Sequence, residues 1–176
     1  RKLLNFSNCK IFNLDKLNYA SDLTSVNNII DISPNKKNRY KFFKCDLSNE
    51  SDVNFIVKEM KPDFIIHLAA ESHVDKSIYN PYSFIESNII GTFNLLNSSL
   101  NYWDNLSPPK KKLFRFLHIS TDEVFGSINS HLKFNENSKY SPNSPYSASK
   151  ASSDHLVRAW FETYKLPTLI TNCSNN

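Results

Sequence analysis

One segment in the middle of the sequence brings together a hydroxyl and two carboxyls, the side chains of Thr121, Asp122 and Glu123. It directly follows a run of apolar residues that is typical of a buried strand. Further along, Tyr146 and Lys150 stand four residues apart in a stretch that is typical of a helix start. A helix would place these two side chains on one face, one turn apart.

The tyrosine and the lysine together could act as a base. A nearby ammonium favours the phenolate and so lowers the pKa of Tyr146, which would allow the phenolate to take a proton near neutral pH. The spacing alone is weak support, because a surface lysine near an exposed helix start gives the same pattern. The neighbouring hydroxyl and carboxyls favour the catalytic interpretation.

The elements that must position these residues alternate between short strands and helices. We expect strands at residues 10–14, 40–45, 64–68, 113–119 and 168–173. We expect helices from residue 21 or 22 to 29, from a cap at Ser48 to Met60, from 81 to 103 and from 146 to 164. This alternation predicts an α/β fold, a doubly wound and mostly parallel sheet with helices on both faces.

The longest predicted helix, at residues 81–103, should pack through one apolar face. The members of that face recur at helical spacing: Phe84, Ile85, Ile89, Phe93, Leu96 and Leu100. Between the predicted elements, residues 33–39, 105–112 and 127–144 are expected to be loops.

Polar clusters follow the predicted strands at their carboxyl ends. Parallel sheets of this kind bind ligands at that edge. The clusters are Asp15 with Lys16, Asp46, residues 69–75, residues 120–123, and Asn175 with Asn176. Their repetition at five strand ends predicts a continuous binding cleft.

Asp15 ends the first predicted strand. Dinucleotide-binding folds place an acid there, about 20 residues after a glycine-rich turn, to hydrogen-bond a ribose hydroxyl. An aspartate in a turn or at a helix cap is an equally good interpretation. A free carboxylate would repel a 2′-phosphate and so favours NAD over NADP. Because Gly91 and Gly126 are the only glycines, we expect the glycine-rich turn and the first strand to precede residue 1.

The composition is that of one ordinary globular domain, with 176 residues, 40% of them hydrophobic and 22% charged. The net charge of +4 comes partly from basic runs at residues 36–39 and 110–112. We expect these runs in solvated loops rather than in a nucleic-acid site. No apolar run approaches the ~20 residues of a membrane span, and no secretory pattern is recognisable.

The cysteines and histidines do not predict a metal site. Cys9, Cys45 and Cys173 are far apart and lie in or beside apolar runs. We therefore expect three buried, reduced thiols, which suits a cytoplasmic location. His67 and His118 lie in apolar strands and are expected in the core.

Three longer motifs carry a resemblance to a known family. They are residues 67–75, 120–124 and 144–156, supported by residues 15–20 and 171–176. Over nearly its whole length, the chain resembles the nucleoside-diphosphate-sugar 4,6-dehydratases of the extended short-chain dehydrogenase/reductase superfamily. The likeness is strongest to members that act on dTDP-glucose. Threonine-aspartate-glutamate at the strand end distinguishes these dehydratases from the epimerases of the superfamily.

This resemblance implies an enzyme that uses NAD and a nucleotide-sugar substrate. It would oxidise C4 of the hexose, eliminate water across C5 and C6, and reduce C6 with the same hydride. Tyr146 would take the C4 hydroxyl proton, and Lys150 would lower the tyrosine pKa and hold the nicotinamide ribose. Thr121 would bind the C4 oxygen. Glu123 would remove the C5 proton, and a protonated Asp122 would help the C6 hydroxyl to leave.

The resemblance also implies further contacts. For the cofactor these are Asp15, Lys16, Leu17 and Asn18 at the adenosine ribose, Asp46 and Leu47 at the adenine, Leu68, Ala69 and Ala70 beside the cofactor with Ser87 behind, and Asn176 at the nicotinamide. For the substrate they are Ser72, Asn175 and Thr121. Ser21 stands where the family usually has a glycine.

At the level of the whole protein, the resemblance implies a homodimer built on two helices per subunit, with Trp103 and Trp160 as candidate anchors. Residues 1–176 would then be a partial Rossmann-like NAD-binding domain, lacking the first strand, the glycine-rich turn and the C-terminal substrate domain. Two alternatives stay open at this point. One is a UDP-glucose 4,6-dehydratase, and the other is a truncated, inactive member that acts as a binding or scaffold protein.

Overall fold

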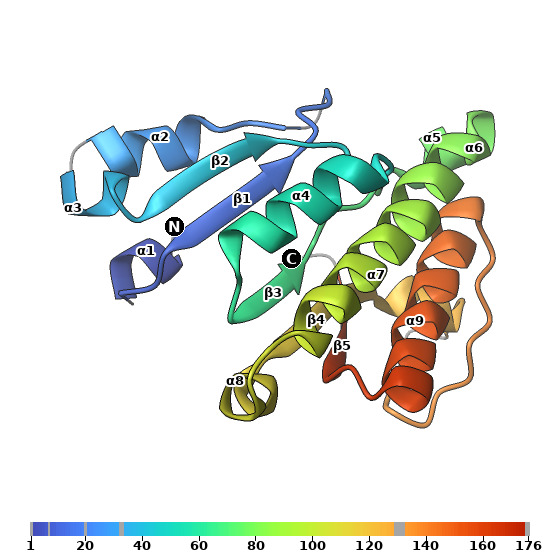
Figure 1. Ribbon diagram of the computed structural model, residues 1–176. Coiled ribbons are helices and arrows are strands. Elements are labelled where there is room, and N and C mark those ends of the chain that lie inside the picture. The colour runs from blue at the N-terminus through green and yellow to red at the C-terminus, as the bar shows by residue number, and fades with distance from the viewer. Residues whose placement is uncertain (1, 7, 20, 32–33, 129–132, 175–176) are drawn as a thin grey trace. The chain divides into compact units, whose positions relative to one another are not determined.

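The computed structural model describes residues 2–6, 8–19, 21–31, 34–128 and 133–174 (Figure 1). The chain forms two compact units, Arg1–Asp46 and Leu47–Asn176. A single partial domain over residues 1–176 stays a prediction.

The first unit contains a two-stranded parallel sheet and three short helices. Its elements are α1 (Lys2–Phe6), β1 (Ile11–Asp15), α2 (Thr24–Asp31), α3 (Pro34–Lys37) and β2 (Tyr40–Lys44). In the sheet, Ile11 pairs with Tyr40 and Asp15 with Lys44. The Asp22 carboxylate accepts a hydrogen bond from the Thr24 N–H at 2.8 Å and so satisfies one of the unpaired amides at the start of α2.

The second unit has a three-stranded parallel sheet in the order β3-β4-β5. Its elements are α4 (Glu50–Met60), β3 (Phe64–His67), α5 (Val74–Tyr79), α6 (Pro81–Phe84), the π-helical segment η1 (Ile85–Ile90), α7 (Gly91–Asp104), α8 (Pro108–Leu113), β4 (Arg115–Thr121), the 3-10 helix η2 (Asp122–Phe125), α9 (Pro145–Tyr164) and β5 (Thr168–Cys173). Helices α4, α7 and α9 lie side by side on one face of this sheet (Figure 1).

The start of α9 is fixed by a capping box. The Ser144 hydroxyl accepts a hydrogen bond from the Ser147 N–H at 3.1 Å, and the Ser147 hydroxyl accepts one from the Ser144 N–H at 3.0 Å. Pro145 follows the cap, at a position where its missing N–H costs nothing. The helix therefore begins one residue before the predicted start, and it ends at Tyr164 as predicted.

The predicted cap of α4 is wrong by one residue. Asn49, not Ser48, is the cap, because its side-chain oxygen accepts a hydrogen bond from the Asp52 N–H at 3.4 Å. The predicted end at Met60 is confirmed. Lys61 takes a left-handed conformation with φ of 47°, and Pro62 follows it.

The predicted apolar face of the long helix is only partly confirmed. Ile85 and Phe93 are 47% and 38% exposed, whereas Asn88 and Thr92 are each 1% exposed. The reason is the π-helical segment η1, which has more residues per turn than an α-helix and rotates the face that follows. Phe84 and Leu96 are buried as predicted.

Two predicted loops contain short helices instead. Residues 34–37 form α3, and residues 108–113 form α8, so both basic runs lie partly on helices. Each helix begins at a proline, whose fixed φ favours a first helical turn. As a result β4 begins at Arg115 rather than at residue 113, and it extends to Thr121. The polar segment after β3 likewise contains α5. The other strands lie within one residue of their predicted positions.

His67 and His118 are buried, as predicted, with exposed fractions of 3% and 0%. Among the cysteines, Cys45 is buried, but Cys9 and Cys173 are exposed, so the prediction of three buried thiols is wrong for two of them. Cys9 precedes β1, and Cys173 is the last residue of β5, the end strand of its sheet. None of the described helices is both long and apolar enough to cross a membrane.

Candidate active site

The carboxyl end of β4 delivers a hydroxyl and two carboxyls to one place. Thr121 is the last residue of the strand and is 7% exposed. Its hydroxyl accepts a hydrogen bond from the Glu123 N–H at 3.3 Å and so caps the 3-10 helix η2. The same hydroxyl lies 3.4 Å from Asp122 Oδ1. The turn therefore holds both carboxyls directly beyond the strand end, as the sequence predicted.

Helix α9 places Tyr146 and Lys150 against this strand end. The two side chains are 8% and 4% exposed, so they are not the surface residues of the alternative interpretation. The Tyr146 phenol is hydrogen-bonded to the Thr121 hydroxyl. Lys150 Nζ donates a hydrogen bond to the Ile119 carbonyl at 2.8 Å. The predicted meeting of the two segments is confirmed.

Burial dominates the titration of the pair. It raises the pKa of Tyr146, and the charges of Glu123 and Asp122 raise it further, while the hydrogen bond with Thr121 opposes the rise. The net direction is opposite to the lowering expected from the lysine. Burial also lowers the pKa of Lys150 from 10.5 to about 8, against the opposing charge of Asp154.

Glu123 is set up as a base. Burial raises its pKa, and the negative charge of the adjacent Asp122 raises it further. A carboxylate with a raised pKa holds an abstracted proton more strongly, and this improves general-base catalysis. Asp122, directly beside it, is likewise half-buried, so two carboxyls are available here for acid and base work.

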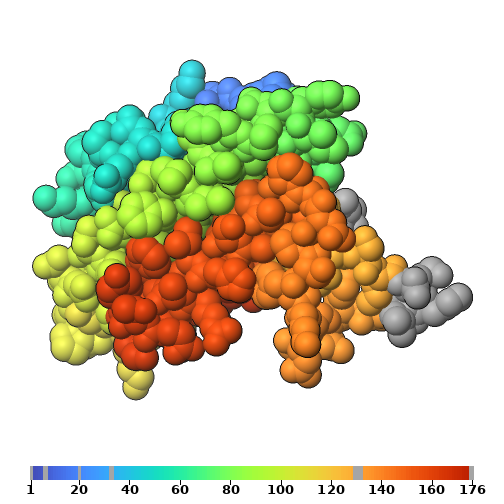
Figure 2. All heavy atoms as spheres, turned by 90° about the vertical axis from the view of Figure 1, so that its right-hand side faces the viewer, coloured from blue at the N-terminus to red at the C-terminus, as the bar shows by residue number. Residues whose placement is uncertain are grey.

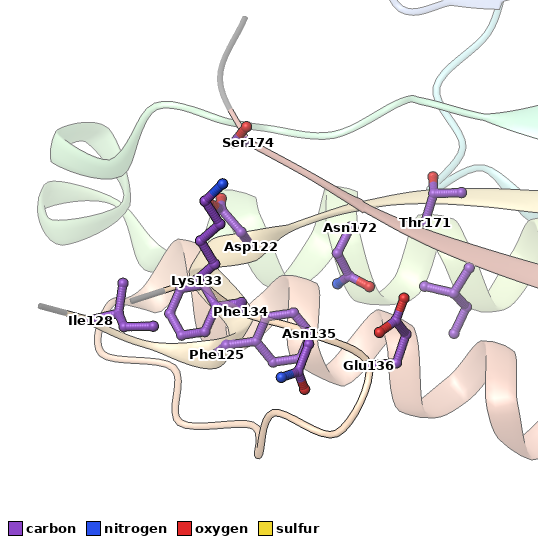
Figure 3. Close-up of a pocket in the computed structure, with 11 residues that line it drawn as sticks. Asp122, Phe125, Ile128, Lys133, Phe134, Asn135, Glu136, Thr171, Asn172 and Ser174 are labelled. Carbon is purple, nitrogen blue, oxygen red and sulfur yellow. The ribbon is translucent and has the colours of Figure 1, made fainter. Parts of the chain in front are cut away.

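A cleft of about 600 Å³ opens beside η2 (Figure 3). Three segments line it: the start of the loop after β4, a short stretch near residue 135, and the end of β5. The lining residues are Asp122, Phe125, Ile128, Lys133, Phe134, Asn135, Glu136, Ile170, Thr171, Asn172 and Ser174. Of the predicted site residues, Asp122 faces this cleft.

The cleft walls beyond residue 125 were not predicted from the sequence. Asn172, for example, donates a hydrogen bond to the Thr121 carbonyl at 3.1 Å and fastens β5 to the end of β4. Phe134 and Glu136 come from a stretch that the sequence marked only as loop. Asn175 and Asn176, predicted at the substrate and the nicotinamide, lie outside the described residues.

The segment after β3 was predicted to pass beside the cofactor. Leu68 is 66% exposed, Ala69 and Ser72 are exposed and Ala70 is half-buried. Small exposed side chains of this kind let a ligand approach the backbone closely. Ser87, predicted behind the cofactor, is half-buried in η1.

Asn88 holds this segment in place and was missed by the sequence analysis. Its side chain accepts a hydrogen bond from the Glu71 N–H at 2.8 Å and donates one to the Glu71 carbonyl at 2.9 Å. It also donates to the Ser149 hydroxyl of α9 at 2.9 Å. One buried amide in the π-helical segment thus joins the loop after β3 to the helix that carries Tyr146 and Lys150.

In the first unit, Asp15 has the turn role that was one of its two interpretations. Its Oδ1 accepts hydrogen bonds from the Leu17 N–H at 2.7 Å and from the Ser21 hydroxyl at 2.8 Å. Leu17 has a positive φ of 56° in this turn. Contact with a ribose stays a prediction for Asp15 and for Lys16, Leu17 and Asn18 beside it. Asp46 ends the first unit and Leu47 begins the second, and their adenine contacts also stay predictions.

The described residues fit a nicotinamide dinucleotide better than a metal. No three described His, Cys, Asp or Glu side chains are grouped so that they could hold a metal ion. In the second unit, the small side chains after β3 suit the backbone approach of a flat ring, and the buried ammonium of Lys150 suits a ribose.

Comparison with known proteins supports this assignment. A family model described as GDP-mannose 4,6 dehydratase matches residues 1–176. The dTDP-glucose 4,6-dehydratase of Shigella flexneri is 49% identical, with 100% of this chain and 50% of that protein covered. That of Salmonella typhimurium is 48% identical, with 94% and 47% covered. The chain spans about half the length of the curated relatives it matches.

Solved structures show the same fold. A dTDP-glucose 4,6-dehydratase from Streptomyces venezuelae with NAD bound gives a TM-score of 0.83 at 36% identity, covering 98% of this chain and 50% of that one. A dTDP-glucose 4,6-dehydratase from Bacillus anthracis with NAD gives 0.79 at 35% identity, covering 99% and 49%. The UDP-Glc/GlcNAc 4-epimerase of Campylobacter jejuni gives 0.78 at 25% identity, covering 96% and 46%. The predicted Rossmann-like α/β fold with parallel strands is confirmed.

The buried ammonium predicts a pH-dependent stability. In the folded protein Lys150 has a pKa of about 8, against 10.5 ordinarily, so the unfolded chain binds the extra proton between these values. Stability therefore rises with pH across this window. Relative to Lys150→Met, the wild-type free energy of unfolding should gain about 3 kcal/mol from below pH 8 to above pH 10.5.

Denaturant unfolding of the full-length protein at a series of pH values measures this difference. Lys58→Met, at an exposed position on α4, is the matched control and should show no such trend. A wild-type-minus-variant difference for Lys150 that stays flat across the window would contradict the buried ammonium.

Proposed function

The chain belongs to the GDP-mannose 4,6 dehydratase family, and we propose that it is the NAD-binding part of a dTDP-glucose 4,6-dehydratase. The enzyme would convert dTDP-glucose to dTDP-4-keto-6-deoxyglucose. One observation carries the proposal: Thr121, Asp122 and Glu123 at the end of β4 meet Tyr146 and Lys150 of α9. The groups needed for proton transfer and for the elimination of water therefore lie together at the end of one strand.

The first step would be oxidation of the sugar at C4. NAD, when bound, would supply a hydride acceptor for C4 and a hydride donor for C6. Tyr146, as phenolate, would accept the C4 hydroxyl proton, while the Thr121 hydroxyl, already bonded to the phenol, would hold the C4 oxygen. Lys150, fixed to the Ile119 carbonyl, would hold the nicotinamide ribose. Its positive charge would also offset part of the rise that burial imposes on the tyrosine pKa.

The second step would be loss of water. A ketone at C4 makes the C5 proton acidic, and Glu123, whose pKa is raised by burial and by its neighbour, is suited to remove it. Asp122 would give its proton to the C6 hydroxyl, which leaves as water. Its position on the wall of the cleft supports this role. After reduction at C6, the protonated Glu123 would return a proton to C5 and so complete the product.

The binding residues outside this cluster remain part of the proposal. Cofactor contacts are proposed for Asp15, Lys16, Leu17, Asn18, Asp46, Leu47, Leu68, Ala69, Ala70, Ser87 and Asn176. Substrate contacts are proposed for Ser72 and Asn175. The exposure of Leu68 and of Ala69 and Ser72 supports ligand access to the segment after β3.

The choice of dTDP-glucose rests on the relatives. Eight of them, 45–49% identical, are dTDP-glucose 4,6-dehydratases or a probable one. The carboxyl pair at residues 122 and 123 argues against an epimerase, which needs no elimination. A cytoplasmic location is proposed because the reaction draws on NAD and nucleotide-sugars.

We also propose that the protein forms a homodimer through α7 and α9. Figure 2 shows these two helices side by side at the surface. Phe93, Phe161 and Tyr164 on this face are 38%, 46% and 49% exposed. Trp160 lies among them, with ring centroids 5.7 Å from Phe93 and 5.4 Å from Tyr164. Trp103 is a weaker anchor, because its indole N–H is bonded to the Lys111 carbonyl within the chain.

A charge on this face should separate the subunits. In the full-length protein, Phe161→Glu is expected to halve the mass measured by sedimentation at micromolar concentration, because it would bury a carboxylate in an apolar interface. Glu162→Gln, a neighbouring exposed position, is the control and should leave the mass unchanged. A wild-type protein that sediments as a monomer would contradict the proposal.

Glu123→Gln tests the mechanism. The full-length variant should still oxidise C4 but lose elimination, so that NADH absorbance builds up in a single turnover and kcat falls by about 10² to 10⁴. Glu162→Gln serves again as the control and should turn over normally.

Parallel assays with dTDP-glucose and UDP-glucose separate the two substrates. Higher kcat/KM with UDP-glucose would overturn the choice of nucleotide. Normal turnover by Glu123→Gln would overturn the assignment of the base.

A further inference from the structure

A buried carboxylate lies behind the proposed active site and takes no part in the proposed reaction steps. Asp154 is on α9, one turn beyond Lys150, and is 1% exposed. Its Oδ2 accepts hydrogen bonds from the Ser120 hydroxyl at 2.7 Å and from the Tyr140 hydroxyl at 3.0 Å. Its Oδ1 lies 3.2 Å from His118 Nε2. Burial of an ionised carboxylate is costly unless nearby groups compensate for it.

His118 does not supply the compensating charge. Burial lowers its pKa, and the positive charge of Lys150 lowers it further, while Asp154 opposes both. His67, with its ring centroid 5.1 Å from that of His118, also has its pKa lowered by burial. Both imidazoles are therefore neutral at neutral pH. Two cations act on this group: the Lys150 ammonium interacts with Asp154 itself, and Arg158 interacts with Tyr140.

Lys150 and Asp154 are fastened to neighbouring residues of β4. The ammonium is bonded to the carbonyl of Ile119, and the carboxylate to the hydroxyl of Ser120. Both anchors come just before Thr121, the residue that caps the turn with the two catalytic carboxyls. The ammonium and the carboxylate, four residues apart on α9, are thus each bonded to β4, and the charge of Asp154 acts on Lys150.

Tyr140 connects Asp154 to the other end of the η2 turn. It lies in the loop between η2 and α9, and its ring packs on Phe125 with centroids 5.3 Å apart. Phe125 is the last residue of η2 and lines the cleft. The next residue in the loop, Ser141, donates a hydrogen bond to the Val124 carbonyl at 2.9 Å. A movement of Tyr140 would therefore displace both the η2 turn and Phe125 on the cleft wall.

We propose that Asp154 is a positioning residue, the buried counter-ion of Lys150 that also holds the Asp122–Glu123 turn against α9 through Ser120 and Tyr140. This inference rests on the proposed dehydratase function. It assigns two separable tasks to one side chain, because its charge acts on Lys150 and its hydrogen bonds act on the turn.

The effect of the Asp154 charge on Lys150 can be tested through the pH dependence of kcat. The titratable groups around Lys150 are Tyr146 and Asp154 on its own helix, His118 on β4 and His67 on β3. Of the two effects on the lysine pKa, burial lowers it and Asp154 raises it. Asp154→Asn should therefore lower that pKa further, and the alkaline limb of kcat should move to lower pH.

The hydrogen-bonding role of Asp154 can be tested by comparing the rate of C4 oxidation with the rate of water elimination. Tyr140→Phe removes one bond to Asp154 and leaves its charge in place. Hydrogen bonds to charged groups are worth about 1.5–3 kcal/mol, which corresponds to a fall in kcat of about 10-fold or more if the bond is needed to hold the turn. Oxidation by Tyr146 should be less affected than elimination, so NADH should build up in a single turnover.

The experiment compares full-length wild type, Asp154→Asn, Tyr140→Phe and the exposed control Asp63→Asn. For each protein, folding is checked by circular dichroism, and kcat, KM and single-turnover NADH are measured from pH 6 to 10. Asp154→Asn should shift the alkaline limb to lower pH. Tyr140→Phe should keep the limb and accumulate NADH, and the control should match wild type. If neither variant shows its signature, or if both lose only stability, the proposal is overturned.

One measurement remains informative without turnover. The lower edge of the pH window of the Lys150→Met stability difference, set by the folded-state pKa, should move to lower pH when Asp154→Asn is present in both proteins, while the upper edge, set by the unfolded chain, stays in place. An unmoved window overturns the counter-ion role. If wild type leaves dTDP-glucose unchanged while the window moves, the dehydratase function fails and the pairing of Asp154 with Lys150 stands.

Discussion

The hydrogen bond from the Lys150 ammonium to the Ile119 carbonyl, 2.8 Å long, joins α9 to the central strand of the sheet. The bond can form only because α9 begins at the Ser144 capping box and because β4 runs on to Thr121. A one-residue shift in the register of α9 against β4 would turn Tyr146 and Lys150 by about 100° around the helix axis. The register of this helix therefore governs whether the phenol meets the Thr121 hydroxyl.

Burying a lysine at this junction has a cost that the surroundings partly offset. The ammonium loses water, and this lowers its pKa to about 8, while Asp154 works in the opposite direction. The same low-dielectric setting raises the pKa of Tyr146 and of Glu123. Burial thus moves the pKa of Lys150 and that of Glu123 towards neutral, and it moves the pKa of Tyr146 away from neutral. Asn88 adds a second junction, from the loop after β3 to the same helix.

Features with a local cause were predicted well from the sequence. The bounds of the helix with Tyr146 and Lys150 could be predicted from the serine and proline at its start and from Pro167 after its end. The strand at Thr168–Cys173 could be predicted from its apolar pattern. Features set by tertiary context were not. The π-helical segment rotates the buried face so that Asn88 replaces Ile85 in the interior, and no period in the sequence signals this. Asp154 was missed as well, because its partners Ser120 and Tyr140 meet it only in the folded chain.

The central claim, that one site oxidises, dehydrates and reduces the same sugar, has a direct isotopic test. The full-length protein would be given dTDP-glucose with deuterium at C4, in ordinary water with NAD, and the product would be analysed by NMR. The account predicts deuterium at C6 of the 4-keto-6-deoxy product and one solvent hydrogen at C5. Deuterium that remains at C4, or that is lost to the solvent, would contradict it.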